Sequence, residues 1–318
     1  MIFENTMENI LKAAAIIKRG GLVSFPTETV YGLGGNAFDP AAVARIFGAK
    51  ARPNFDPLIT HIADLEMLDK ISIIQDKKIV DIIDKFWPGS LTLIVPKKAI
   101  IPHLVTSGLE TMAVRMPDHP TALALIREST GAVAAPSANP FGYLSPTTAM
   151  HVEEPLGNKI EMILDGGTCR IGVESTVLDV TGDRPIVLRP GGISYEDLRS
   201  VIPDVIIFNR TTTSPTAPGQ LKMHYSPSKP LHIVDTIDSV QDRKKSGALI
   251  FKEGPDTTGF FSVEILSPIG DPVEAAARLF VALHNLDKTN IQNIYAEKIP
   301  ETGLGRAVMD RIYKASEK

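Results

Sequence analysis

The sequence predicts an α/β protein with two domains, a larger one with a mixed sheet and a smaller one with a parallel sheet. Helical and extended patterns alternate through the first 200 residues, which is typical of α/β domains. A segment rich in Thr, Ser and Pro interrupts this pattern at 209–230. Strands that alternate with helices then resume. We therefore expect domains at 1–208 and 231–318, joined by a linker at 209–230.

Short apolar runs predict the strands of the first domain. They lie at 22–25, 58–62, 91–95, 112–114, 133–135, 162–164, 176–180 and 186–188. Apolar residues at helical spacing predict helices at 10–17, 41–47, 76–86, 119–128 and 195–200. The helix at 41–47 follows Asp39-Pro40, an N-cap with proline at the first helical position.

The second domain shows the same kinds of pattern. Strands are expected at 231–234, 247–251, 261–266 and 291–296, and helices at 272–286 and 304–314. The stretch at 129–152 is the longest run without Asp, Glu, Lys or Arg, but its prolines and small polar residues predict a loop.

Composition narrows the class of protein. A net charge of −4 argues against a general nucleic-acid coat, although a local basic patch could still bind RNA. The single cysteine, Cys169, rules out an internal disulfide framework and fits a buried small residue in a reducing compartment. Neither a signal peptide nor a membrane span is evident, so we expect a cytoplasmic protein.

The segment Lys50-Ala51-Arg52-Pro53 places two cations one residue apart, just before the predicted strand at 58–62. Lysine offers phosphate a point charge and arginine a planar fork, so the pair could hold a polyphosphate. A solvated pair near a helix C-terminus is the alternative. The chain has no P-loop motif, so a phosphate site here would be of another kind.

A glycine cluster, Gly32-Leu33-Gly34-Gly35, loosely matches a dinucleotide-binding fingerprint. The following helix has its own cap, and the first glycine lies far from the end of the preceding strand. Both points favour a glycine turn without a ligand. The neighbouring Thr27-Glu28-Thr29 could hold a small polar ligand or cap a turn.

Three further segments place polar groups at the ends of predicted strands. Arg115 ends one strand, where it could fork a carboxylate or make an ordinary salt bridge. Small residues with hydrogen-bonding groups follow another strand at 134–148, where Ser145 could also be only a helix cap. The segments Gly172-Val173-Glu174-Ser175-Thr176 and Arg189-Pro190-Gly191 complete the set. No histidine pair has metal-ligand spacing, and no motif marks a catalytic nucleophile.

Taken in order, these segments resemble the YrdC-type threonylcarbamoyl-AMP synthases over residues 7–205. The linker, with Pro218-Gly219 and His224-Tyr225-Ser226-Pro227, is similar to that of the two-domain form, and the resemblance implies that Tyr225 would close over the nucleotide as a lid. The resemblance implies a YrdC-like mixed-sheet domain followed by a smaller Rossmann-like domain. It also implies a reaction in which L-threonine, bicarbonate and ATP give threonylcarbamoyl-AMP and pyrophosphate, for transfer to tRNA by other proteins.

The resemblance also assigns roles to individual residues. Lys50 and Arg52 would be catalytic. The ATP site would comprise Lys50, Arg52, Asp56, Thr111, Ser137, Asn139, Ser145, Arg189 and Tyr225. The threonine site would comprise Thr29, His61, Arg115, Ala135 and Ser175. Mg²⁺ is expected with ATP, without a dedicated protein cage. Asp56 is the odd member, because a carboxylate beside a triphosphate repels it.

Two other functions fit parts of the pattern. A module that binds RNA in the same basic concavity would need no chemistry, but the net charge and the small-ligand motifs argue against it. A carbamoyl-transfer module, as in hydrogenase-maturation relatives, would bring zinc-finger modules that a chain with one cysteine lacks.

Overall fold

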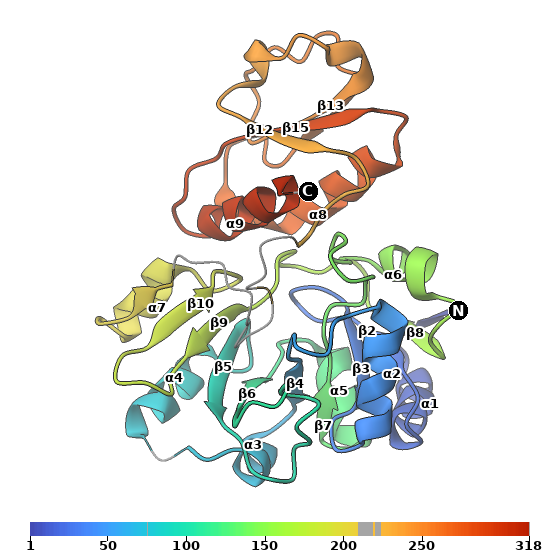
Figure 1. The fold of residues 1–318 in the computed structure, drawn as a ribbon, viewed down its shortest axis with the longest axis vertical. Coiled ribbons are helices and arrows are strands. Elements are labelled where there is room, and N and C mark those ends of the chain that lie inside the picture. Colours follow the sequence, from blue (N-terminus) through green and yellow to red (C-terminus); the bar gives the residue numbers. More distant parts are fainter. Residues whose placement is uncertain (75, 209–218, 220–223, 318) are drawn as a thin grey trace.

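The computed structural model describes residues 1–74, 76–208, 219 and 224–317, and these form two α/β domains. Figure 1 shows a large domain below and a small domain above, with the small sheet uppermost. The large sheet has 11 strands in the order β1-β8-β2-β3-β7-β4-β6-β5-β9-β10-β11, and the small sheet has four in the order β12-β15-β13-β14. The predicted linker at 209–230 falls largely outside the described residues.

The strands of the large domain are β1 (Ile2–Glu4), β2 (Val23–Phe25), β3 (Gly32–Asn36), β4 (Ile59–Ile62), β5 (Leu91–Pro96), β6 (Thr111–Arg115), β7 (Ala132–Ala134), β8 (Met162–Asp165), β9 (Thr176–Asp179), β10 (Ile186–Arg189) and β11 (Ile206–Ile207). Its helices are α1 (Met7–Lys18), α2 (Pro40–Lys50), α3 (Leu65–Ile71), α4 (Lys77–Phe86), α5 (Pro120–Glu128), α6 (Ala149–Leu156) and α7 (Tyr195–Val201). Parallel pairs such as β4–β6 and antiparallel pairs such as β5–β6 confirm the predicted mixed sheet.

The glycine cluster forms strand β3, so the interpretation as a turn was wrong. Gly34 pairs with Val23 of β2, and Gly35 pairs with Ala134 of β7. A Cβ at Gly34 would lie 2.7 Å from the Phe25 ring and 2.9 Å from Val133. Glycine is therefore needed because side chains of neighbouring strands cover this strand closely. The cluster does not open a helix, which removes the dinucleotide interpretation.

Part of the stretch predicted as a loop is helical. Helix α6 begins at Ala149, and its N-cap is Thr148, whose side chain accepts a hydrogen bond from the His151 amide. Ser145 is therefore not the cap. The sequence analysis also missed β1, α3 and β11, which are too short for a clear period.

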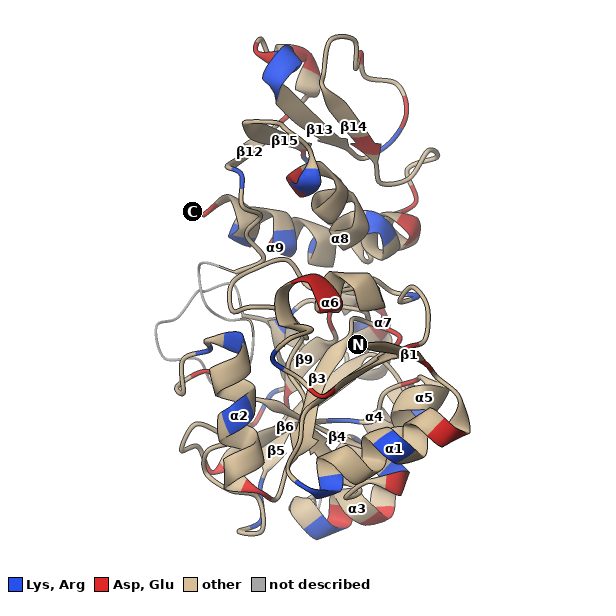
Figure 2. Cartoon of the chain, turned by 90° about the vertical axis from the view of Figure 1, so that its right-hand side faces the viewer, with Lys and Arg blue, Asp and Glu red and all other residues tan. Residues whose placement is uncertain are grey.

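The small domain contains β12 (Leu231–Val234), β13 (Ser246–Ile250), β14 (Ser262–Ile265), β15 (Asn293–Glu297), α8 (Pro272–Lys288) and α9 (Gly305–Ser316). All of its strand pairs are parallel, as predicted. Figures 1 and 2 show α8 and α9 as a layer between this sheet and the large domain. Val30, Leu144 and Val173 of the large domain belong to the same buried apolar cluster as these helices. The two domains therefore share a core.

Three buried histidines should make the free energy of unfolding depend on pH. Burial lowers the pKa of His61 and of His151 to about 3 and that of His284 to about 4. The rings of His151 and His284 stack at 3.8 Å where α6 meets α8.

None of the helices within the described ranges has the length and apolarity of a membrane span.

We expect the protein to lose stability as the pH falls below 6.5. An unfolded histidine takes up a proton near that pH, whereas these folded ones do so only near pH 3–4. Each should lower the free energy of unfolding by about 1 kcal/mol per pH unit. Melting temperatures at pH 7.5 and 5.5 test this. The variant His284→Phe should show a smaller difference, and an unchanged difference would contradict the assignment.

Candidate functional site

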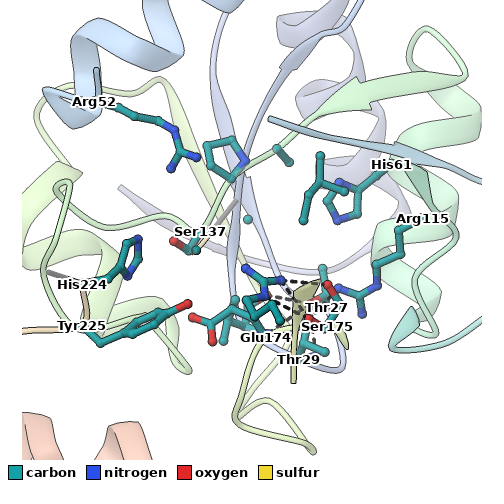
Figure 3. Close-up of a pocket in the computed structure, with 17 residues that line it drawn as sticks. Thr27, Thr29, Arg52, His61, Arg115, Ser137, Glu174, Ser175, His224 and Tyr225 are labelled. Atoms are coloured by element: carbon teal, nitrogen blue, oxygen red, sulfur yellow. Dashed lines mark hydrogen bonds between the residues drawn. The ribbon is translucent and has the colours of Figure 1, made fainter. Parts of the chain in front are cut away.

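A pocket opens where loops and strand ends of the large sheet converge (Figure 3). Its lining includes nine of the fourteen residues predicted for the site: Thr29, Arg52, His61, Arg115, Ala135, Ser137, Ser175, Arg189 and Tyr225. Lys50, Asp56, Thr111, Asn139 and Ser145 are not part of the lining. Segments that lie far apart in the sequence thus meet at one concavity, as expected of a small-molecule site.

One end of the pocket contains Arg115 and His61. These residues are register partners on the parallel strands β6 and β4. Arg115 donates from Nη1 to Thr29 Oγ1 at 2.8 Å and from Nε to the Gly89 carbonyl at 3.0 Å. Its Nη2 pairs with Glu28 Oε1, and both side chains are buried. The guanidinium is therefore fixed from three sides.

His61 contributes a neutral ring to this end. Burial, and then the charge of Arg115, lowers the pKa of His61 to about 3. Its Nδ1 is buried and has no hydrogen-bond partner among the residues that the structure describes, and the same holds for His224 Nδ1 and Tyr225 Oη elsewhere in the lining. Buried polar atoms are normally paired. Their concentration in the lining indicates that a polar ligand completes the pocket.

Arg52 lies at the opposite end and is held by Asp56. Arg52 Nη2 is 2.9 Å from Asp56 Oδ2 and donates to the Pro57 carbonyl, also at 2.9 Å. Burial raises the pKa of the Asp56 carboxyl, and the charge of Arg52 opposes that rise. Asp56 thus lies behind Arg52 instead of facing the pocket, which answers the concern about its charge.

Lys50 is buried below the pocket. Its ammonium group donates to the Ser137 carbonyl at 2.5 Å and to the Asn139 carbonyl. Burial lowers the pKa of Lys50 well below its usual value, with a further contribution from the charge of Arg52. In this arrangement Lys50 fixes the backbone beside Ser137, and it does not reach the lining itself.

The remaining three predicted residues also lie outside the lining. Ser145 donates from Oγ to Glu174 Oε1, and Asn139 donates from Nδ2 to the Tyr143 carbonyl at 2.8 Å. Thr111 pairs with Pro96 at the opposite end of β6 from Arg115. Thr111 and Arg115 are four positions apart along the strand, a span of about 13 Å.

Arg189 reaches the pocket from the end of β10, where the register with β9 shifts between Val187 and Arg189. Its Nη2 donates to the Ser175 carbonyl at 2.9 Å and to Ser175 Oγ at 3.1 Å. A Cβ at Gly191 would lie 2.3 Å from the Glu174 carbonyl oxygen. The glycine of the Arg-Pro-Gly segment therefore allows its backbone to approach the Glu-Ser-Thr segment closely.

Tyr225 closes one side of the pocket, next to His224 and Gly219. It is almost fully buried and has a positive φ of 63°. Such a backbone conformation is costly for a residue with a bulky side chain, and surrounding contacts must hold it. Burial raises the pKa of the Tyr225 hydroxyl, so the group is protonated at neutral pH.

Sequence reasoning missed several lining residues, among them Thr27, Glu174 and His224. It also missed Glu28, which pairs with Arg115 but does not itself line the pocket. Glu28 and Glu174 lie inside segments that the sequence analysis quoted, but an acidic residue did not suit a site for anions. Their partners, Arg115 and Arg311, are far away in the sequence. In the described part of the chain, no three His, Cys, Asp or Glu residues are grouped so that they could hold a metal ion.

We expect Asp56→Asn to lower the free energy of unfolding by about 3 kcal/mol, because it leaves the buried Arg52 charge without its carboxylate. Urea denaturation measures the loss. The double variant Arg52→Met/Asp56→Asn should be more stable than Asp56→Asn alone, since neither charge remains. Equal stability of the two variants would show that the pair is not coupled.

Comparisons with known proteins identify the family of both domains. The family model described as "Telomere recombination" matches residues 15–191, and that described as "Threonylcarbamoyl-AMP synthase, C-terminal domain" matches residues 193–317. A threonylcarbamoyl-AMP synthase of Pyrococcus abyssi is 45% identical over 96% of this chain and 93% of its own length. One of Bacillus subtilis is 42% identical over 96% of this chain and 92% of its own. A solved structure, P. abyssi Sua5 complexed with L-threonine, superimposes with a TM-score of 0.91 at 43% identity, covering 99% of this chain and 96% of that one.

Proposed function

The chain belongs to the threonylcarbamoyl-AMP synthase family, and we propose how its pocket residues divide the reaction among them. It is a transferase that makes threonylcarbamoyl-AMP for tRNA modification. The substrates in this proposal are L-threonine, bicarbonate and ATP. Pyrophosphate leaves, and the product passes to the tRNA threonylcarbamoyl-transfer machinery in the cytoplasm.

Threonine binds at the end that contains Arg115. The guanidinium, already fixed by Thr29 and Glu28, presents its remaining N–H groups to the amino-acid carboxylate. Neutral His61 and the hydroxyls of Thr29 and Ser175 offer uncharged hydrogen bonds to the substrate hydroxyl and amine. The Pyrococcus relative, solved in complex with L-threonine, supports a threonine site in this fold.

ATP binds at the end that contains Arg52, Arg189 and Tyr225. The threonine amine and bicarbonate form an N-carboxylate and release water, and an oxygen of this N-carboxylate then attacks the α-phosphorus of ATP. The bond to the β-phosphate breaks and pyrophosphate takes the electron pair. Fixed positive charge stabilises such a transition state without a protein nucleophile. Tyr225 excludes water from the reactive intermediates.

Lys50 supports this end from below by holding the backbone of Ser137 and Asn139. Magnesium would enter on the triphosphate, because the described residues offer no carboxylate cage for it. Its charge would offset that of the phosphates, and the roles given to the arginines do not depend on its position.

The observation that carries this proposal is that three arginines from three separate segments line one pocket. We expect the purified protein to release pyrophosphate from ATP only when both threonine and bicarbonate are present. A coupled pyrophosphate assay with each substrate omitted in turn tests this. Pyrophosphate release that does not depend on threonine would contradict the proposal. Salt-sensitive RNA binding without pyrophosphate release would favour an RNA-binding module.

Arg52→Ala should lower kcat by at least about 100-fold, because it removes fixed charge next to the reacting phosphates. Circular dichroism should show the native fold, and Lys12→Ala, at an exposed surface pair, serves as the control with full activity. A kcat within twofold of the wild-type value would show that Arg52 has no direct part in the reaction.

Arg115→Lys should raise the KM for threonine by about tenfold, because lysine keeps the charge but loses the fork. The KM for ATP should change little, since Arg115 lies at the other end of the pocket (Figure 3). Initial rates at varied threonine and varied ATP separate the two constants. A larger rise in the KM for ATP than in the KM for threonine would mean that the two substrates bind at the opposite ends of the pocket from those proposed.

A further inference from the structure

Arg311 is a charged side chain that is fully buried where the C-terminal domain meets the pocket. It lies on α9 and has 0% exposure. A buried guanidinium is stable only where carboxylates and hydrogen bonds compensate for its lost hydration. The groups around Arg311 therefore show what the side chain is there to contact.

Most of those contacts are with the pocket of the first domain. Arg311 Nε donates to Glu174 Oε2 at 2.8 Å, and Nη1 donates to the Pro190 carbonyl at 2.9 Å. Glu174 lines the pocket, and Pro190 directly follows Arg189. The guanidinium carbon also lies 5.0 Å from the centre of the Tyr225 ring, which is a cation–π contact.

Helix α9 anchors this contact with residues of its own. Asp310 accepts a hydrogen bond from Arg311 Nη1 at 2.6 Å and pairs with Lys314 at 2.8 Å. Lys314 in turn donates to the Gly219 carbonyl at 2.9 Å. Gly219 and Tyr225 both line the pocket. One face of α9 thus supports two parts of the wall.

Glu174 explains why this support matters for ATP. A carboxylate in a site for a triphosphate repels its ligand, and Glu174 is almost fully buried, where charges are poorly screened. The charges of Arg311 and Arg189 both lower the pKa of Glu174, so it is ionised at neutral pH. Arg311 offsets that charge from the side away from the ligand and holds Oε2 toward α9.

We propose that Arg311 is a positioning residue for ATP: it neutralises Glu174 and supports the Tyr225 ring, so that the C-terminal domain completes the active site of the first domain. This inference rests on the proposed function. It assigns the second domain a direct part in nucleotide binding, through one buried side chain.

The variant Arg311→Met, which keeps the length but removes the charge, tests the proposal. We expect the KM for ATP to rise by about tenfold, because Glu174 then faces the phosphates without its ion-pair partner. The KM for threonine should stay within about twofold. The double variant Glu174→Gln/Arg311→Met removes both charges and should recover most of the loss. A side chain that only packs the two domains together would give no such recovery.

Asp287→Asn is the matched control. Asp287 also lies on the C-terminal domain at its boundary with the large domain, where it accepts hydrogen bonds from Tyr143 Oη at 2.5 Å and from Ser228 Oγ at 2.7 Å, but it does not line the pocket. This variant should lower the melting temperature and leave the KM for ATP unchanged. An equal rise in both variants would mean that any loosening of the boundary is enough, and would overturn the proposal.

The other possible results also support or refute the role proposed for Arg311. If Arg311→Met does not fold, Arg311→Lys should fold and show an intermediate KM for ATP, and a wild-type value would refute the proposal. Equal rises in both KM values, or no recovery in the double variant, would refute it too. Arg52→Ala in the same assay separates the two hypotheses: if it is inactive while Arg311→Met behaves as wild type, only the role of Arg311 fails.

Discussion

Three arginines in or beside this pocket each pair with a buried carboxylate, and the rest of the site depends on that compensation of charge. Arg115 pairs with Glu28, Arg52 with Asp56 and Arg311 with Glu174. An unpaired guanidinium in such a place would cost several kcal/mol of stability. The carboxylates lower this cost and also fix the direction of each guanidinium. Preorganised charge of this kind is what a reaction at phosphorus requires.

The mixed sheet explains how these groups come together. Parallel pairing of β4 with β6 places His61 beside Arg115, and the register shift in β10 re-aims Arg189. Gly191 then lets the end of β10 approach the segment before β9. The close packing of the glycine strand β3 keeps the sheet continuous beneath the pocket. Strand register thus determines where the side chains of His61, Arg115 and Arg189 lie in the pocket.

Residues at the boundary between the two domains also support the pocket. Apolar residues of both domains share one core, and α9 extends from it to the pocket wall with Arg311 and Lys314. Tyr225, whose backbone has a positive φ of 63°, places its ring 5.0 Å from the Arg311 guanidinium of that helix. A chain that lacked the second domain would need another group to balance Glu174.

The sequence by itself determined the α/β class, most strands and helices, and nine of the residues that line the pocket. It did so because apolar periodicity and ordered motifs are local signals, and the motifs together resemble one family. It failed at β3, since glycine was taken for a turn although neighbouring side chains require it in a strand. Only the tertiary structure decided where Lys50 and Asp56 lie, that Glu174 lines the pocket, and that Glu28 and Arg311 pair with residues of its lining. Those roles depend on pairs far apart in the chain, such as Glu174 with Arg311, and burial makes such pairs obligatory only once the chain has folded.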